Sequence, residues 1–177
     1  MRLPGDPRPE ESTARMIRVD HAGEYGAARI YAGQLAVLGR SEQAPVLRHM
    51  REQEKQHLER FEEFLVRRRV RPTALLPFWH VAGFALGAAT AALGRRAAMA
   101  CTVAVEEAID RHYANQADEL DDTEAELRTT IETFRAEELE HRDIGLAHGA
   151  EETPGYRLLK AAIMTGCRVA IAVSERV

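Results

Sequence analysis

Cysteine is scarce in this sequence, and its scarcity excludes several kinds of site. Cys101 and Cys167 are the only two cysteines in 177 residues, and they form no Cys-x-x-Cys motif. A structural zinc site or a disulfide framework needs several closely spaced cysteines or histidines. Both cysteines lie in apolar helical patterns, so we expect buried, free thiols in a reducing compartment.

The sequence also lacks an excess of either charge. Its 24 basic and 28 acidic residues give a formal net charge of -4. A nucleic-acid-binding domain normally carries a basic surface, so we expect no nucleic-acid partner. Aromatic residues make up 6% of the chain, and Ala, Leu, Glu and Arg are abundant. This composition favours an all-α protein.

Long apolar runs are missing as well. The N-terminus has no apolar run typical of a secretory signal, and it lacks the Arg-rich, Ser-rich composition of a transit peptide, which favours a bacterial source. With Pro4, Pro7 and Pro9, residues 1–12 are predicted to be a disordered tail, and residues 13–177 a single domain.

The longest apolar run, residues 81–93, has 13 residues, whereas a membrane-spanning helix needs about 20. Trp79 precedes the run and Arg95 and Arg96 follow it, as in segments that lie among lipid headgroups. We therefore expect Leu75–Leu93 to contact a membrane surface. An ordinary buried helix is the alternative.

Apolar periodicity predicts six helices and no strand or Gly-rich phosphate loop. Small residues around Glu24, including Gly23 and Gly26, predict close approach of a neighbouring helix there. The predicted helices run from Ser12 or Thr13 to about Leu38, from Ser41 to the arginines at 67–71 and Pro72, over 75–93, from about Arg96 to Leu120, from the acidic turn at 121–123 to His148, and onward from Pro154 and Gly155.

Four of these helices carry charged residues on the stripe that should be buried. The pattern is an internal repeat, because a lone Glu is followed 30 or 32 residues later by Glu-x-x-His in each half. Two helical hairpins related in this way predict a ferritin-like four-helix bundle with an internal two-fold repeat. The remaining predicted segments are additional apolar helices, one of them interfacial. The charged residues are Glu24, Glu54, His57, Glu106, Glu138 and His141.

A single Glu on a helix is usually solvated, and a lone Glu-x-x-His is weak evidence for a metal site. Four carboxylates on buried stripes are different, since an unpaired buried charge costs several kcal/mol. Two divalent ions balance the four negative charges, so these six residues predict a dinuclear metal site. Carboxylate and imidazole ligands without thiolate suit iron or manganese better than zinc or copper. Reaction with O2 or simple oxidation of Fe(II) is the expected chemistry.

Several motifs closely resemble the demethoxyubiquinone hydroxylase family, and the resemblance covers nearly the whole chain beyond the tail. The matching segments are VDHAGEYGA at 19–27, IYAGQ at 30–34, EKQHL at 54–58, CTVAVEE at 101–107, His112-Tyr113, EELEHRDIG at 137–145 and SERV at 174–177.

The resemblance implies a di-iron monooxygenase that hydroxylates the ring of 2-methoxy-6-polyprenyl-1,4-benzoquinol with O2 in ubiquinone biosynthesis. It places the iron ligands on the six residues already selected. It also gives His112 and Tyr113 a part in electron transfer or substrate contact, although packing is an equal alternative for Tyr113. NADH is the implied reductant, but the sequence has no dinucleotide-binding fingerprint.

A polyprenyl quinol is confined to the bilayer, so the resemblance gives the apolar segment a purpose. We expect the protein to be peripheral, on the cytoplasmic face of a bacterial inner membrane or the matrix face of the mitochondrial inner membrane. The resemblance also implies a homo-oligomer or a complex with other biosynthetic proteins as partners. Trp79, Phe84 and Leu86 are the candidate residues for membrane contact or a substrate channel.

Three other functions remain open from the residues alone. A quinol oxidase of the alternative-oxidase kind would reduce O2 to water without adding oxygen to the ring. An iron-handling protein of the ferritin or rubrerythrin type would normally lack the apolar segment. A non-enzymatic lipid-binding bundle would contain no iron.

Overall fold

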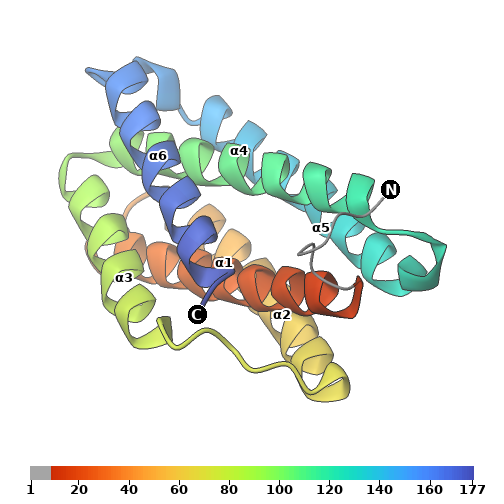
Figure 1. Ribbon diagram of the computed structural model, residues 1–177. Coiled ribbons are helices and arrows are strands. Elements are labelled where there is room, and N and C mark those ends of the chain that lie inside the picture. Colours follow the sequence, from red (N-terminus) through yellow and green to blue (C-terminus); the bar gives the residue numbers. More distant parts are fainter. Residues whose placement is uncertain (1–8) are drawn as a thin grey trace.

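Six α-helices make up most of the computed structural model, which describes residues 9–177 (Figure 1). Within this range there are two short 3-10 helices and no strand, so the prediction of an all-α protein is confirmed. The helices are α1 (Pro9–Leu38), α2 (Ala44–Arg68), α3 (Leu76–Ala92), α4 (Arg95–Glu119), η1 (Asp122–Glu124), α5 (Ala125–Ala147), η2 (Ala150–Glu152) and α6 (Tyr156–Ser174).

The first helix begins earlier than predicted. It starts at Pro9, and Glu10 and Glu11 occupy its first turn. Proline is favoured in a first turn because its nitrogen has no hydrogen to leave unpaired, and acidic residues there suit the helix dipole. Residues 9–12 therefore belong to the helix and not to the predicted tail. The remainder of that tail, residues 1–8, lies outside the described residues.

The second helix begins later than predicted. Ser41 lies in the preceding turn, where its hydroxyl donates a hydrogen bond to the Leu38 carbonyl, and the helix starts at Ala44 with Pro45 in its first turn. It ends at Arg68 because Arg69 adopts a left-handed conformation with φ of 54°. Arg67 and Arg68 form ion pairs with Glu126 and Glu124, so these arginines join α2 to the start of α5 and to the 3-10 helix before it.

The four long helices form two antiparallel hairpins. α1 packs against α2, and α4 packs against α5. The crossover between the hairpins contains α3, which packs along α1, while α6 returns along α4 (Figure 1). This is the ferritin-like arrangement of a four-helix bundle with one long crossover.

Two apolar layers lie at different levels of the bundle. One contains Ile17, Phe61, Phe64, Leu127 and Ile131, from the beginning of α1 and α5 and the end of α2. The other combines residues from the later part of α1, the beginnings of α2 and α4 and the end of α5. Its main members are Tyr31, Leu47, Met50, Met99 and Val103. The charged residues of the internal repeat fall between these layers in the sequence of each helix.

Close approach of α3 to α1 depends on three glycines. A Cβ added to Gly87 would lie 1.9 Å from the Ile30 carbonyl oxygen, and one added to Gly33 would lie 2.1 Å from the Phe84 carbonyl oxygen. Gly83 meets the Gly26 carbonyl oxygen in the same way at 2.9 Å. A neighbouring helix therefore does approach α1 closely at Gly26, as predicted. The residue that must be small there is Gly83 of α3, because a Cβ added to Gly23 or Gly26 meets nothing within 4 Å.

These contacts predict opposite effects of two Gly→Ala substitutions. We expect Gly87→Ala to destabilise the fold by about 1–3 kcal/mol, because the new methyl group collides with backbone of α1. Gly23→Ala is the matched control, and it is expected to stabilise α1 by about 0.5–1 kcal/mol. Urea unfolding followed by circular dichroism measures both. Equal effects of the two substitutions would contradict the close packing of α1 and α3.

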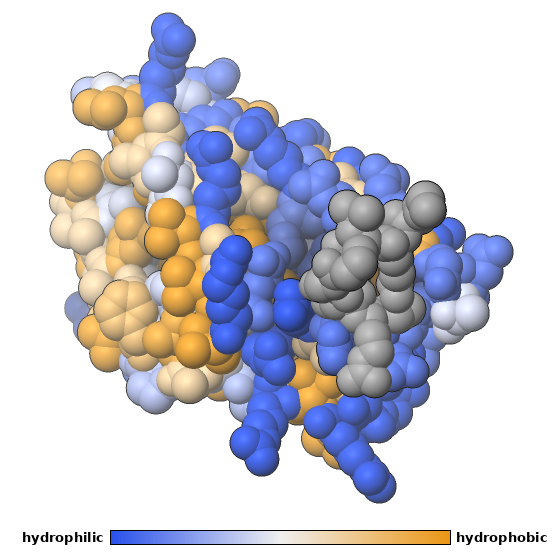
Figure 2. Space-filling model, viewed as in Figure 1, coloured by the Kyte–Doolittle hydropathy of each residue, from blue (hydrophilic) through white to orange (hydrophobic). Residues whose placement is uncertain are grey.

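α3 and α6 leave part of their apolar surface uncovered (Figure 2). Phe78 and Val81 on α3 are 60% and 66% exposed, and Leu158 and Val169 on α6 are 79% and 58% exposed. We call these four residues the α3–α6 apolar face. Nowhere in residues 9–177 is a helix both long enough and apolar enough to pass through a bilayer.

Candidate metal centre

The six charged residues of the internal repeat lie together inside the bundle. Each is at most 1% exposed. They form two groups whose ligand atoms lie within 4.8 Å of one another, and Glu54 and Glu138 belong to both groups. The first group is Glu24, Glu54, His57 and Glu138, and the second is Glu54, Glu106, Glu138 and His141. We call the groups the His57 position and the His141 position.

The two histidines turn the same ring atom toward the carboxylates. His57 Nδ1 lies 3.4 Å from Glu24 Oε2 and 3.2 Å from Glu138 Oε1. His141 Nδ1 lies 3.1 Å from Glu54 Oε1 and 3.3 Å from Glu138 Oε2. The two oxygens of Glu138 therefore face different histidines, as expected of a carboxylate that bridges two ions.

Most of these inward atoms lack a hydrogen-bond partner. Both oxygens of Glu54 and of Glu138, one oxygen each of Glu24 and Glu106, and Nδ1 of both histidines are buried without one. Buried polar atoms are nearly always paired in native proteins, so a cluster of unpaired ones needs an explanation. Divalent metal ions would satisfy these atoms, because each of them is a carboxylate oxygen or an imidazole nitrogen.

Without metal, the clustered carboxylates repel one another. Burial, and then the charges of Glu138 and other neighbours, raise the pKa of Glu54 and Glu106 well above the usual value. Glu138 behaves differently. Burial by itself would raise its pKa, but the imidazoles of His141 and His57, whose Nδ1 atoms lie 3.3 and 3.2 Å from its oxygens, hold the pKa at about 2. Positive charge at this place therefore favours the ionised form of all the carboxylates.

The outer nitrogen of each histidine contacts the opposite Glu-x-x-His helix. His57 Nε2 lies 2.5 Å from Glu137 Oε2, and His141 Nε2 lies 3.0 Å from Gln53 Oε1. Both oxygens accept a hydrogen from Nε2, so in the neutral form of each imidazole the unprotonated nitrogen is Nδ1, which faces the carboxylates and can bind a metal. Phe134 also stacks on the His57 ring, with centroids 3.9 Å apart.

The two lone glutamates each accept a hydrogen bond from a buried tyrosine. Tyr31 of α1 donates to Glu106 of α4 at 2.6 Å, and Tyr113 of α4 donates to Glu24 of α1. Burial and the neighbouring glutamates raise the pKa of both phenols well above 10, so both stay protonated. The internal repeat thus extends to the surrounding shell, with each tyrosine seven residues after the lone Glu of its own helix.

Sequence reasoning missed part of this shell. Tyr31, Gln53 and Glu137 were not recognised as functional residues. The repeat contained the signal, because Tyr31 follows Glu24 as Tyr113 follows Glu106. Gln53 and Glu137 likewise stand immediately before the two Glu-x-x-His motifs.

His112 lies farther from the ligand atoms than Tyr113 does. His112 Nε2 is 3.1 Å from Asp20 Oδ1, which also accepts a hydrogen bond from Gln116 at 2.8 Å. Burial opposes the charged imidazole, but the Asp20 carboxylate raises the pKa of His112 above the usual value. The side chain of His112 is 16% exposed while Asp20 is buried, so this group extends from near the surface toward the centre.

The three residues predicted for membrane contact or a channel are each partly buried. Trp79 donates a hydrogen bond to Ser174 at 3.1 Å, and Arg29 lies over the Phe84 ring at 5.1 Å. Leu86 packs against the cluster formed by α4 and α6. These residues join α3 to its neighbours, and the large apolar residues of α3 that are exposed are Phe78 and Val81.

The cysteines are free thiols, as predicted. Cys101 is buried and Cys167 is partly buried, and both belong to the apolar contact region of α4 and α6. Burial raises the pKa of Cys101 to about 12 and that of Cys167 to about 11. Neither thiol is therefore ionised at neutral pH, which agrees with a packing role.

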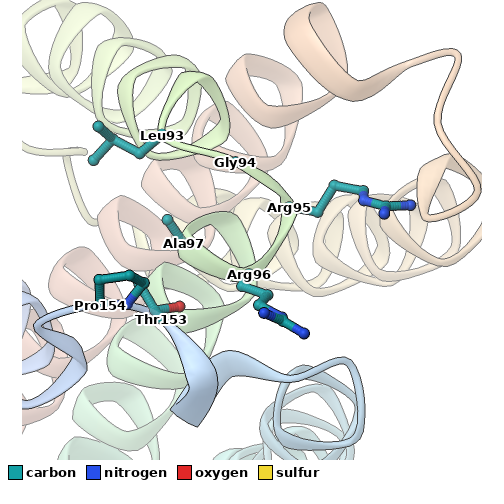
Figure 3. A pocket seen from close by; sticks show the side chains of 7 residues that line it. All are labelled: Leu93, Gly94, Arg95, Arg96, Ala97, Thr153 and Pro154. Atoms are coloured by element: carbon teal, nitrogen blue, oxygen red, sulfur yellow. The ribbon is translucent and has the colours of Figure 1, made fainter.

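A cavity of about 420 Å³ lies at the turn between α3 and α4 (Figure 3). Leu93, Ala97, Thr153 and the two arginines after the turn line it. Glu106 follows Arg96 by ten residues on α4, which corresponds to about 15 Å along the helix. The cavity is therefore separate from the metal centre.

Comparison with known proteins shows the family to which this chain belongs. The family described as "Ubiquinone biosynthesis protein COQ7" matches residues 11–174. A 3-demethoxyubiquinol 3-hydroxylase of Rhodospirillum rubrum is 61% identical over 177 residues, covering 99% of this chain and 84% of the relative.

Mitochondrial relatives are similarly close. The NADPH-dependent 3-demethoxyubiquinone 3-hydroxylase of Homo sapiens is 61% identical, covering 92% of this chain and 76% of the relative. The 5-demethoxyubiquinone hydroxylase of Saccharomyces cerevisiae is 42% identical, covering 92% and 77%. These relatives are named as hydroxylases, which are oxidoreductases. This chain belongs to the COQ7 family of ubiquinone biosynthesis proteins.

Proposed function

We propose that this protein is a di-iron monooxygenase that hydroxylates the ring of 2-methoxy-6-polyprenyl-1,4-benzoquinol (demethoxyubiquinol) with O2. The observation that carries the proposal is the pair of buried ligand groups that share Glu54 and Glu138. The names of the relatives supply the substrate class and the reaction.

Iron is the proposed metal because all six ligands are carboxylates or imidazoles. Carboxylates are hard Lewis bases and imidazoles are borderline ones, and the set contains no thiolate. It matches the ligand set of the ferritin-like di-iron carboxylate proteins. Glu24 and His57 would hold one ion, Glu106 and His141 the other, and Glu54 and Glu138 would bridge them. When bound, the two irons would supply the activation of O2 and the electrons that reduce it.

The side chains around the ligands have their own tasks in this proposal. Tyr31 and Tyr113 hold the lone glutamates by donating a hydrogen bond to each, so those carboxylates keep one oxygen for the metal. The apolar layers on either side exclude water from the centre. Tyr113 and His112 lie on the side of Glu24 that leads toward the surface, and we assign them to electron transfer or substrate contact.

The reductant is proposed to be a nicotinamide. The mitochondrial relatives are named as NADPH-dependent, whereas the sequence resemblance implied NADH. The chain has no dinucleotide-binding fingerprint, so a nicotinamide would have to bind without the usual Gly-rich turn.

A peripheral position on the membrane follows from the substrate. The polyprenyl tail keeps the quinol in the bilayer, and the α3–α6 apolar face exposes four large apolar side chains on two helices that contact each other. We propose that this face rests on the inner membrane, on the cytoplasmic side in a bacterium or the matrix side in a mitochondrion. There its apolar side chains would exchange contacts with water for contacts with lipid, which is favourable.

Charged residues on the α3–α6 apolar face should abolish membrane binding. We expect Phe78→Asp combined with Val81→Asp to release the protein from phosphatidylcholine–phosphatidylglycerol liposomes in a flotation assay. Each aspartate would have to enter the headgroup boundary, at a cost of a few kcal/mol. The matched control is Val66→Asp on α2, where the valine is 78% exposed. Unchanged flotation of the double variant would contradict the proposed orientation.

Isotope tracing tests the reaction itself. Purified, iron-loaded protein with demethoxyubiquinol, a reductant and 18O2 should give a hydroxylated quinone that carries one 18O atom. Consumption of O2 without label in the ring would identify a quinol oxidase instead. Iron oxidation without quinone turnover would identify an iron-handling protein.

A further inference from the structure

The two metal positions are nearly symmetric in their ligands but differ in one residue of the surrounding shell. Each position has one unshared Glu, one His and the two shared glutamates, Glu54 and Glu138. Each unshared Glu accepts a hydrogen bond from a tyrosine. The histidines differ, because His57 contacts the carboxylate of Glu137 and His141 contacts the neutral amide oxygen of Gln53.

We propose that Glu137 makes the two metal positions inequivalent, so that the His57 position binds a divalent ion more tightly than the His141 position does. The inference deepens the proposed function and rests on it for the presence of two ions. Glu137 acts here as a positioning residue, since it touches the ligand His57 and not the metal.

The contact distances agree with this difference. The Nε2 to oxygen distance is 2.5 Å for His57 and Glu137, and 3.0 Å for His141 and Gln53. Hydrogen bonds to an ionised acceptor are shorter and roughly twice as strong as those between neutral groups. A carboxylate that accepts the outer hydrogen of an imidazole makes the inner nitrogen a stronger donor to a metal, and loss of such a partner typically costs about 10- to 100-fold in metal affinity.

The ring of His57 is also held more firmly. Phe134 stacks on it with centroids 3.9 Å apart, whereas the nearest ring to His141 is that of Tyr31, edge-on at 6.2 Å. A ring fixed by stacking and by a charged hydrogen bond needs less reordering when the ion binds. The stacking of Phe134 and the hydrogen bond to Glu137 therefore both favour tighter metal binding at the His57 position.

The chain offers a matched pair of substitutions. Glu137→Gln gives His57 the kind of partner that His141 has, and Gln53→Glu gives His141 the kind that His57 has. The side chain of Glu137 is 38% exposed and Gln53 is partly exposed, so neither substitution buries a new charge. Glu140→Gln, at an exposed site on the same helix, is the control for the loss of a charge from α5.

The test is anaerobic titration of the metal-free protein with Co2+, followed by visible absorption. We expect two binding steps in the wild type, separated by about tenfold or more. Glu137→Gln should weaken the tighter step about 10- to 100-fold and merge the two steps. Gln53→Glu should tighten the weaker step, and Glu140→Gln should change neither.

Removal of one unshared ligand assigns each step to a position. In a Glu106→Ala background the His57 position keeps its four ligands, and adding Glu137→Gln should weaken the remaining step. In a Glu24→Ala background the His141 position remains, and adding Glu137→Gln should leave its affinity unchanged. Mössbauer spectra of 57Fe2+-loaded protein provide an independent readout, with two distinct iron signals in the wild type that converge in Glu137→Gln.

The outcomes separate this inference from the proposed function. Wild-type protein that binds fewer than two ions would defeat the proposed di-iron centre. Two ions that bind with equal affinity, or two steps that Glu137→Gln leaves unchanged, would overturn the inference and leave the di-iron centre intact. Correct folding of each variant is checked by circular dichroism before the titration.

Discussion

Glu138→Ala is expected to reduce the bound iron from two ions per chain to none and to abolish quinol hydroxylation. Glu138 belongs to both ligand groups, and its two oxygens face His57 and His141 separately. Its removal takes one ligand from each position and leaves the two histidines without their common negative partner. Iron is measured by mass spectrometry after anaerobic loading, and hydroxylation by chromatography of the quinones.

Glu106→Ala is the informative companion of this variant. Glu106 belongs to the His141 position only, so we expect one tightly bound ion to remain. Hydroxylation should still be lost, because one ion cannot supply the second redox equivalent of a dinuclear centre. Glu140→Ala, at an exposed position on the same helix as Glu138, should retain both ions and full activity. Activity in either ligand variant would refute the role assigned to the cluster.

Removal of the metal is expected to destabilise the protein strongly. Each occupied site contributes about 2.7 kcal/mol when the free ion is at 100 times its dissociation constant, and two sites contribute about twice that. Without the ions, the carboxylates remain buried and repel one another, which lowers the free energy of unfolding. A drop of many degrees in the unfolding temperature after treatment with a chelator, reversed by Fe2+, is the expected result in a thermal melt.

The loss of stability on metal removal should be larger at pH 8 than at pH 6. The pKa values of Glu54 and Glu106 are raised, and, against the effect of burial, the surrounding glutamates raise the pKa of His57 to about 12, so the folded, metal-free protein binds more protons than the unfolded chain does. The stability of the metal-free protein therefore falls as the pH rises from the usual pKa of histidine toward that of the buried His57. Metal binding shows the opposite trend, because it requires deprotonated ligands. Equal losses at both pH values would contradict this assignment.

Substitution of Glu54, a residue shared by both ligand groups, by an apolar residue should affect stability and function in opposite directions. Glu54 is fully buried, and neither of its oxygens has a hydrogen-bond partner. We expect Glu54→Met to make the metal-free protein about 1–3 kcal/mol more stable than metal-free wild type, since an unsatisfied buried polar group is removed. The same variant should bind no iron pair. Lower stability of Glu54→Met would indicate that the carboxylate is satisfied in the metal-free protein.

Much of the fold followed from periodicity. Apolar residues at helical spacing predicted all six helices, and their ends were wrong by a few residues where proline and capping chemistry compete. α1 starts at Pro9 because proline and two glutamates suit a first turn, and α2 starts after Ser41 because Pro45 sets its first turn. Periodicity fixes which residues share a face, whereas helix ends depend on local hydrogen bonds that many residue types can provide.

The sequence by itself determined the six candidate ligands. A charged residue on a buried stripe is costly, so six of them in a twofold repeat left few explanations. Tertiary structure alone decided which residues support them. Tyr31, Gln53 and Glu137 each contact a ligand residue on another helix. Such contacts depend on how the helices are rotated and spaced relative to one another. The outward face of α3 was decided in the same way, because its glycines press one side against α1 and leave Phe78 and Val81 exposed.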